Sequence, residues 1–258
     1  MRKGHLDVTL ATFGAQVLLG KFRALTIDGE VQTEDGRAVT QRHQLDIPVG
    51  GRTFKFMVEE LITSEGAGAI RQSGLNVTVF TIAGSLLLGR FKSGSLKVTT
   101  VTDDGAGGAD EWQYPTAQGT DYSVDGEFQI ADTALFNSLM LASGISGLLT
   151  TAAISVGGIA FAAPMTLKTS GQGVRTKEIQ TERATLTGRG TPTTATGNTF
   201  LTSILLGSAS VAYSVNSGAG SYYGDALITD STLNFAGKQL VSASHTFQAY
   251  GQPSGIAP

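Results

Sequence analysis

Polar and apolar residues alternate in short runs along much of this chain, a pattern that indicates β-strands rather than long helices. Val8 and Leu10, for example, alternate with the polar residues Asp7 and Thr9. The dipeptides Asp35-Gly36 and Asp104-Gly105 suit tight turns, because glycine supplies the positive φ that a hairpin needs. The pattern predicts strands in the segments LDVTLATF, QVLLGKFRALTIDGEVQ, QLDIPV and RTFKFMV.

The N-terminal half contains one pattern twice. Residues 6–44 align with residues 75–113 without a gap, and 12 of the 39 positions are identical. The alignment places TEDG (33–36) over TDDG (102–105), each inside a polar segment that is typical of a hairpin tip or a long loop. We call this correspondence the N-terminal repeat and interpret it as one structural unit used twice.

Two short helices are predicted in the second half. DTALFNSLMLASG begins at Asp132, a suitable N-cap, and reaches Gly144, while NTFLTSILLG begins at Asn198 and reaches Gly207. Polar caps and a terminal glycine are typical of helix boundaries. We expect helices over residues 132–143 and 198–206, each covering one open side of a sheet with a one-sided apolar stripe.

Strand-like runs follow each helix, and these two series also correspond. RATLTGRGTP (183–192) aligns with SHTFQAYGQP (244–253), a correspondence that we call the C-terminal repeat. The chain therefore consists of four related β-rich pieces, two in a region 1–119 and two, each with a helix, in a region 120–258. We expect a mainly β fold with two domains, each of two packed sheets or a β-barrel and each with one small helix. One domain with an embellished N-terminal half is the alternative, and the sequence leaves open whether the pieces pair in order or cross over.

Composition and charge narrow the class of protein. The 258 residues include 34 Gly and no Cys, which excludes a disulfide framework and a thiolate metal site. No signal-peptide pattern is recognised, and the uncharged stretch 133–167 contains too much Gly, Ser and Thr for a membrane-spanning helix. Residues 98–167 contain eight acidic residues and no Lys or Arg. This segregation fits a solvated acidic loop, or an acidic surface that meets a basic one in the same chain or in a neighbouring copy.

The sequence contains no recognisable catalytic constellation. A single His on a predicted strand is usually structural, and His5, His43 and His245 are far apart in the chain. The Gly-rich stretches lack the Lys-Ser/Thr of a phosphate loop, and no His/Asp/Glu group has metal-ligand spacing. We therefore expect no enzymatic activity, no cofactor and no metal.

The C-terminal part resembles a known family. TERATLTGRGTP, a short helix and SYYGDALITDSTLNFAGKQLVSASHTFQAYGQP are similar to the end of phage major tail proteins, the tail tube proteins. The resemblance covers about residues 120–258 and reaches the N-terminal half only through the repeats. It implies a β-barrel-like fold with a flanking helix, in rings whose inner sheets line a channel. Such rings stack into the tail tube of the virion and pass DNA during ejection.

The resemblance also implies partners and contact sites. The partners would be further copies of the chain in trimeric or hexameric rings, the tape-measure, terminator and baseplate proteins, and DNA in transit, with assembly in the host cytoplasm and no membrane insertion. Another β-rich virion component (a decoration, collar or baseplate protein) or a carbohydrate-binding adhesin module is the alternative. Contacts between rings are expected at the two hairpin loops: Thr33, Glu34, Asp35, Gly36, Arg37, Thr102, Asp103, Asp104, Gly105, Asp110, Glu111 and Trp112.

Overall fold

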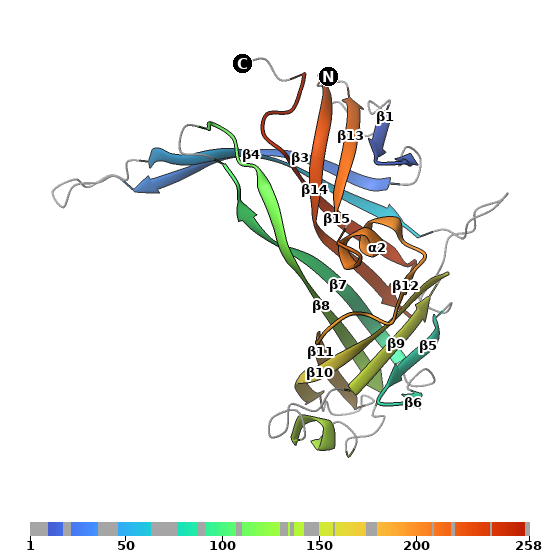
Figure 1. Cartoon of the computed structure of the whole chain (residues 1–258). Coiled ribbons are helices and arrows are strands. Elements are labelled where there is room, and N and C mark those ends of the chain that lie inside the picture. Colours follow the sequence, from blue (N-terminus) through green and yellow to red (C-terminus); the bar gives the residue numbers. More distant parts are fainter. Residues whose placement is uncertain are drawn as a thin grey trace.

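The computed structural model consists mainly of antiparallel strands (Figure 1). It describes residues 10–17, 22–35, 46–62, 77–86, 91–106, 110–129, 134, 137–141, 150–156, 158–173, 180–207, 209–217, 220–237 and 239–255. In this part of the chain, fifteen strands form one hydrogen-bonded sheet that does not close into a barrel. The prediction of a mainly β fold is confirmed, and the sheet is open and not closed into the β-barrel that was one of the two expected forms.

The first eight strands are two sets of four at a constant spacing. The N-terminal repeat carries the bounds of β2 and β3 onto those of β6 and β7. The first set is β1 (Leu10–Phe13), β2 (Gln16–Val17), β3 (Phe22–Asp35) and β4 (Asp46–Leu61). The second set is β5 (Val77–Ile82), β6 (Ser85–Leu86), β7 (Phe91–Asp104) and β8 (Pro115–Gln129).

The later strands also come in two sets, and the C-terminal repeat carries β11 onto β15. The first set is β9 (Thr150–Val156), β10 (Ile159–Gly173) and β11 (Thr181–Gly188). The short β12 (Thr194–Thr196) and the helix α2 (Thr199–Leu205) follow. The second set is β13 (Ser210–Ser217), β14 (Gly220–Ala236) and β15 (Ser242–Ala249).

Hydrogen bonding joins these sets crosswise. β1 pairs with β13 and β4 pairs with β15, so β1–β4 and β13–β15 form one unit, here called unit A. β5–β8 pair in the equivalent way with β9–β11 and form unit B. Both units have the same bulge, between Ile228 and Asp230 in β14 and between Leu167 and Thr169 in β10.

The four pieces therefore cross over instead of pairing in chain order. The division into residues 1–119 and 120–258 stays a prediction. Its boundary falls inside β8, a continuous strand that is paired with β7 on one edge and β11 on the other. Because a strand paired on both edges holds its neighbours together, the hydrogen-bonded units run across this boundary.

Strand β14 joins the two units. One edge of β14 pairs with β15, and the other pairs first with β13 and then with β7 of unit B. In the β14–β7 pair, Asp230 faces Thr99 and Ala236 faces Ser93. This pairing creates one continuous layer of eight strands, in the order β3-β4-β15-β14-β7-β8-β11-β10, which we call the long layer.

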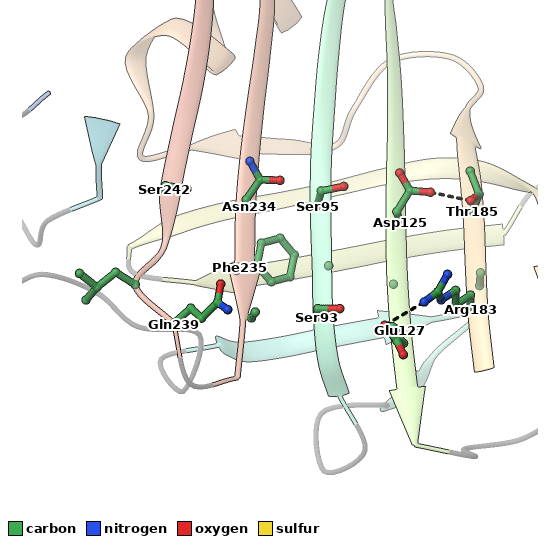
Figure 2. A pocket seen from close by; sticks show the side chains of 15 residues that line it. Ser93, Ser95, Asp125, Glu127, Arg183, Thr185, Asn234, Phe235, Gln239 and Ser242 are labelled. Carbon is green, nitrogen blue, oxygen red and sulfur yellow. Dashed lines mark hydrogen bonds and ion pairs between the residues drawn. The ribbon is translucent and has the colours of Figure 1, made fainter. Parts of the chain in front are cut away.

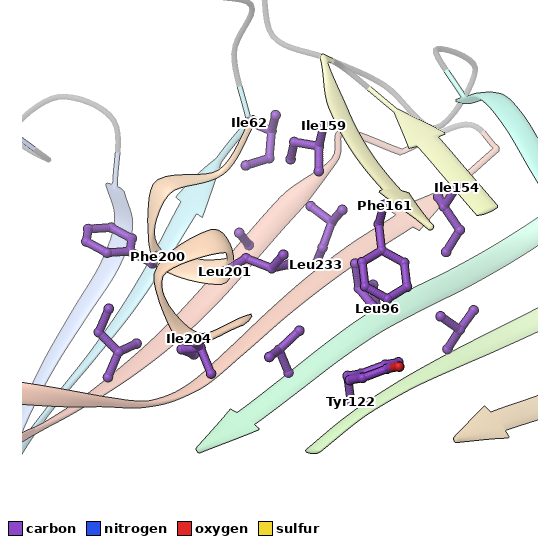
Figure 3. Packing of buried hydrophobic residues seen from close by; sticks show 14 of the residues in the cluster. Ile62, Leu96, Tyr122, Ile154, Ile159, Phe161, Phe200, Leu201, Ile204 and Leu233 are labelled. Carbon is purple, nitrogen blue, oxygen red and sulfur yellow. The ribbon is translucent and has the colours of Figure 1, made fainter. Parts of the chain in front are cut away.

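The core lies between one face of the long layer and the remaining strands. Phe13 of β1 stacks on Phe247 of β15 with ring centroids 4.1 Å apart, and Phe80 of β5 lies 5.1 Å from Phe128 of β8. Figure 3 shows the middle of this cluster, where Leu201 of α2 and Leu233 of β14 are both buried. Burial of such a side chain contributes roughly 1.5–3 kcal/mol, so the packing of α2 on β14 stabilises the fold.

Helix α2 begins and ends as its sequence predicts. The side chain of Asn198 accepts a hydrogen bond from the backbone N–H of Leu201, and Gly207 ends the helix with a φ of 73°. Phe200, Leu201 and Ile204 of the predicted apolar stripe are buried. Of the first predicted helix, residues 134 and 137–141 are helical, and its remaining residues lie outside the described part.

Candidate functional site

The face of the long layer that points away from the core is polar. Successive side chains of a strand point to opposite faces, so one residue in two of each strand belongs to this surface. Most of these side chains carry a hydroxyl, an amide or a charge, and we call the set the polar face. Its members in β3, β4, β15, β14, β7, β8 and β11 are Thr26, Asp28, Glu30, Lys55, Met57, Glu59, Ser242, Ser244, Thr246, Gln248, Asp230, Thr232, Asn234, Ser93, Ser95, Lys97, Thr99, Ser123, Asp125, Glu127, Arg183, Thr185 and Thr187.

A hollow crosses the polar face where β15, β14, β7, β8 and β11 lie side by side (Figure 2). Short side chains such as Ser93, Ser95 and Ser242 line it, which leaves the space open. At one side, Thr185 donates a hydrogen bond to the carboxylate of Asp125. The hollow is therefore an open depression in the sheet, lined largely by short polar side chains.

The cations of the polar face are held in ion pairs. Lys97 of β7 lies 3.0 Å from the Asp230 carboxylate of β14, across the junction between the two units. Lys55 lies 3.2 Å from Glu30. Arg183 lies 3.7 Å from Glu127, which also accepts a hydrogen bond from Lys92 at 2.9 Å.

Glu127 shows the electrostatic effect of these contacts. The hydrogen bond from Lys92 lowers the pKa of the Glu127 carboxyl, and the charges of Lys92 and Arg183 add to this effect against a smaller opposing effect of burial. The carboxyl is thus held ionised. Because each Lys or Arg of the polar face is held by a carboxylate, the surface offers few free cations to a phosphate group.

The residues expected in the hairpin loops lie at the ends of the two long hairpins. Thr33–Asp35 end β3, and Thr102–Asp104 are exposed at the end of β7. The Asp104 carboxylate accepts hydrogen bonds from the backbone N–H of Ala106 and of Tyr114, which closes the β7–β8 hairpin. Gly36 and Arg37 lie outside the described residues, and Gly105 donates its N–H to the Tyr114 carbonyl.

The segment Asp110–Trp112 contacts unit A of its own chain. The Arg52 N–H of β4 donates to the Glu111 carbonyl at 2.7 Å, and its guanidinium lies 6.0 Å from the Trp112 ring. The Arg52 and Glu111 side chains form a long ion pair of 3.9 Å. The structure thus separates the described loop residues into strand ends, of which Thr102–Asp104 are exposed, and a segment that is docked on β4.

A buried polar network in unit A has the composition of a catalytic triad. Ser231 Oγ lies 3.0 Å from His245 Nδ1, and His245 Nε2 lies 3.0 Å from Glu60 Oε1. Asn198 Nδ2, at the start of α2, donates to the same oxygen at 3.2 Å. Ser231 and His245 are 1% and 0% exposed, so no substrate reaches the hydroxyl. The network joins β4, β14, β15 and α2, and its place in the fold is structural.

Sequence patterns alone missed both the polar face and this network. The face has a signal, because Ser93, Ser95, Lys97 and Thr99 alternate with core residues in one strand. The network has none, because Glu60 is 185 residues away from His245 in the chain. Among the described residues, no group of three His, Cys, Asp or Glu side chains is placed to hold a metal ion. No described helix is long and apolar enough to cross a membrane.

Comparison with known proteins gives few matches. No protein-family model matches the chain, and no curated protein does. A chain in the tail of an empty gene transfer agent particle, from a helical refinement with C6 symmetry, aligns with a TM-score of 0.31 and 10% identity, over 53% of this chain and 96% of that chain. A chain from the virion of a native gene transfer agent particle aligns with a TM-score of 0.25 and 8% identity, over 76% and 100%. Scores this low carry no argument about fold or function, which leaves the strand pairing and the polar face as the basis for a proposal.

Proposed function

We propose that this protein is a structural virion component that self-assembles into stacked rings and forms a phage tail tube. The observation that carries the proposal is the long layer, which runs through both units. It ends on β3, whose one described partner is β4, and on β10, whose edge away from β11 has no described partner beyond Met165. Open edges of this kind are templates for pairing with another chain. When the two edges are different surfaces, repeated pairing generates a ring or a filament.

The polar face is the proposed lining of the channel. It is rich in hydroxyl groups, and its cations are held by carboxylates, as in the Lys97–Asp230 pair. DNA affinity depends largely on Lys and Arg side chains that neutralise phosphates. A lining whose cations are paired with carboxylates supports fast passage of DNA, as ejection requires. The tape-measure protein would occupy the channel before ejection.

The ends of the two long hairpins are the proposed contacts between stacked rings. Thr33–Asp35 and Thr102–Asp104 lie at the far ends of long two-stranded hairpins, where a neighbouring ring is within reach. Terminator and baseplate proteins are the proposed partners at the two ends of the tube. Assembly would take place in the host cytoplasm, and the mature protein would reside in the tail.

Electron microscopy of the purified protein at rising concentration tests the proposal. We expect hollow rings or tubes of uniform width, and a rotational average would give the number of units in a ring. Small monodisperse particles at every concentration would contradict the tube. They would favour a decoration, collar, baseplate or adhesin role, which binding to capsids and to glycans would then test.

A pair of deletions tests the hairpin ends separately. Removal of Glu34–Val39 or of Asp103–Ala109 should leave the fold intact, because the described residues of these segments lie at the ends of β3 and β7 and none of them belongs to the buried core. The circular dichroism spectrum should be unchanged, and rings should form without stacking into tubes. Normal tubes from both deletions would refute the assignment of these loops.

A further inference from the structure

The two strands that form the junction between units A and B each have an equivalent strand elsewhere in the chain, and each equivalent has an edge without a described partner. Inside the chain, β14 of unit A pairs with β7 of unit B from Asp230 to Ala236. The strand equivalent to β14 is β10, and the strand equivalent to β7 is β3. On the edge away from β11, β10 is paired with β9 up to Met165, and no described strand pairs with the segment that follows. β3 has one described partner, β4.

We infer that β10 of one chain pairs with β3 of a second copy in the same antiparallel register that β14 and β7 use within the chain. Each residue of an observed pair can be replaced by its equivalent in the N-terminal or the C-terminal repeat. The Asp230–Thr99 pair then corresponds to Thr169 opposite Glu30, and the Thr232–Lys97 pair corresponds to Gly171 opposite Asp28. This inference rests on the proposed function and names the contact that would build its ring. Units A and B then alternate, and a closed ring contains an even number of units.

Exposure of equivalent residues agrees with a missing neighbour. Leu96 and Val98 of β7 are fully buried under the junction, whereas Ile27, the equivalent of Leu96, is only half-buried. Thr100 is 5% exposed and donates a hydrogen bond to the Ile228 carbonyl, but its equivalent Val31 is 47% exposed. A branched apolar side chain on an open strand edge is a feature that an interface would cover.

Charge favours pairing of unlike edges over pairing of like edges. β3 presents Asp28 and Glu30 beside its open edge, and β10 presents the exposed Lys168. A two-fold contact of β3 with β3, or of β10 with β10, would bring like charges together, which is unfavourable across a strand pair. The mixed contact brings opposite charges together. Within the chain the signs are reversed, with Lys97 on β7 and Asp230 on β14.

Disulfide trapping tests the register, and the absence of native Cys keeps the background clean. Facing residues of an antiparallel pair have Cα atoms about 4.5–5.5 Å apart, within the range of a disulfide. The variant Glu30→Cys with Thr169→Cys should form, on oxidation of assembled particles, a ladder of linked chains on a non-reducing gel. The last band of the ladder counts the chains in a ring.

Three matched variants make the test specific. Thr99→Cys with Asp230→Cys places the same pair at the junction inside the chain, and it should form a disulfide without any ladder. Thr26→Cys with Thr169→Cys moves the partner on β3 from Glu30 to Thr26, out of register, and it should form no ladder. Thr169→Cys alone should remain monomeric on the gel, whereas a band that stops at two chains would reveal two-fold pairing of β10.

The outcomes separate this inference from the proposed function. Rings or tubes without a Glu30→Cys/Thr169→Cys ladder, or with an equal ladder from the Thr26→Cys control, would overturn the register while the tube stands. A specific ladder in a preparation that forms no hollow particle would support the edge pairing and overturn the tube. Neither assembly nor a ladder, with the internal Thr99→Cys/Asp230→Cys disulfide formed, would overturn both.

Discussion

Units A and B share a backbone pattern but fill their cores differently. In unit B, Phe128 packs against Phe80 and Phe91, with ring centroids 5.1 and 6.2 Å apart. In unit A the equivalent position on β4 holds Glu60, which faces Phe22 and Ala243 as Phe128 faces Phe91 and Glu182. One unit thus has a buried aromatic ring where the other has a buried carboxylate.

In unit B the buried carboxylate lies on the neighbouring strand. Glu182 of β11 is 1% exposed, and its equivalent in unit A is Ala243. Ser170 donates a hydrogen bond to Glu182 at 3.4 Å, while its equivalent Ser231 contacts His245. A buried polar group is tolerated where it has a partner. Strand register and the bulge are therefore common to both units. The buried side chains differ between the units, and in each unit the buried carboxylate has a hydrogen-bond partner.

Among the changes that test this comparison, Phe128→Ala should have the largest effect on the free energy of unfolding. Removal of a fully buried ring leaves a cavity beside the stacked rings of Phe80 and Phe91, and such changes cost about 3–5 kcal/mol. Urea unfolding measures the change in the free energy of unfolding. Met57→Ala, at an exposed position of the polar face, is the control and should change it by about 0.5 kcal/mol or less. A loss below about 1 kcal/mol for Phe128→Ala would mean that unit B is loosely packed.

The polar network of unit A should show strong coupling. Glu60→Ala removes the partner of both His245 and Asn198, and leaving buried polar groups unsatisfied costs about 1–3 kcal/mol for each group. His245→Ala should cost less in the Glu60→Ala background than in the wild type, with an interaction energy of about 1–3 kcal/mol. A double-mutant cycle by urea unfolding measures this value. Additive effects would show that the two side chains do not stabilise each other.

Two buried tyrosines, one in each unit, differ in the hydrogen bonding of their hydroxyl groups, so removal of the hydroxyl should affect stability differently. Tyr122 in unit B has its hydroxyl 2.9 Å from the Gly190 carbonyl and 3.2 Å from that of Pro164. The buried Tyr213 hydroxyl in unit A has no hydrogen-bond partner in the described part of the chain. Tyr122→Phe should cost about 1 kcal/mol, and Tyr213→Phe should be neutral or stabilising. Equal costs in thermal unfolding would contradict this assignment.

The same tyrosine gives a dependence on pH. Burial, with a contribution from the Asp225 charge, raises the pKa of Tyr213 to about 12. The folded protein therefore keeps the hydroxyl protonated at pH values where the unfolded chain, with a tyrosine pKa of about 10, loses the proton. The contribution of the Tyr213 hydroxyl to the free energy of unfolding is fully present below pH 10 and falls as the pH rises toward 12. Tyr213→Phe should lose less stability over that interval than the wild type.

The sequence predicted the backbone well because the relevant signals are local or repeated. The recurrence of TEDG as TDDG within the N-terminal repeat, and the cap at Asn198, can be recognised from short segments, and strand bounds and α2 follow them. The crossed pairing of the four pieces could not be predicted from the sequence, because both pairing orders satisfy the same alternation of polar and apolar residues. The Glu60–His245 contact spans 185 residues and leaves no local pattern.

The smallest expected effect comes from an ion pair that both units contain. Lys92–Glu127 in unit B, at 2.9 Å, and Arg23–Glu59 in unit A, at 3.3 Å, occupy equivalent strand positions. The Glu127 side chain is 16% exposed and that of Glu59 is 38% exposed, so water screens the unit A pair more strongly. Lys92→Ala should therefore cost more than Arg23→Ala, with both at or below about 1 kcal/mol.

The pH dependence of the Lys92 effect has a defined sign. Since the pKa of Glu127 is lowered by its hydrogen bond with Lys92, the stabilisation is present above the pKa of the unfolded carboxyl and disappears as the pH falls through the lower folded pKa. Lys92→Ala should raise the pKa of Glu127 toward its ordinary value of 4.5, as a carboxyl-carbon NMR titration would measure. The variant and the wild type should then become equally stable at acid pH. A constant difference at all pH values would show that Lys92 acts through the packing of its aliphatic chain, and the equivalence of the two ion pairs would then be one of position alone.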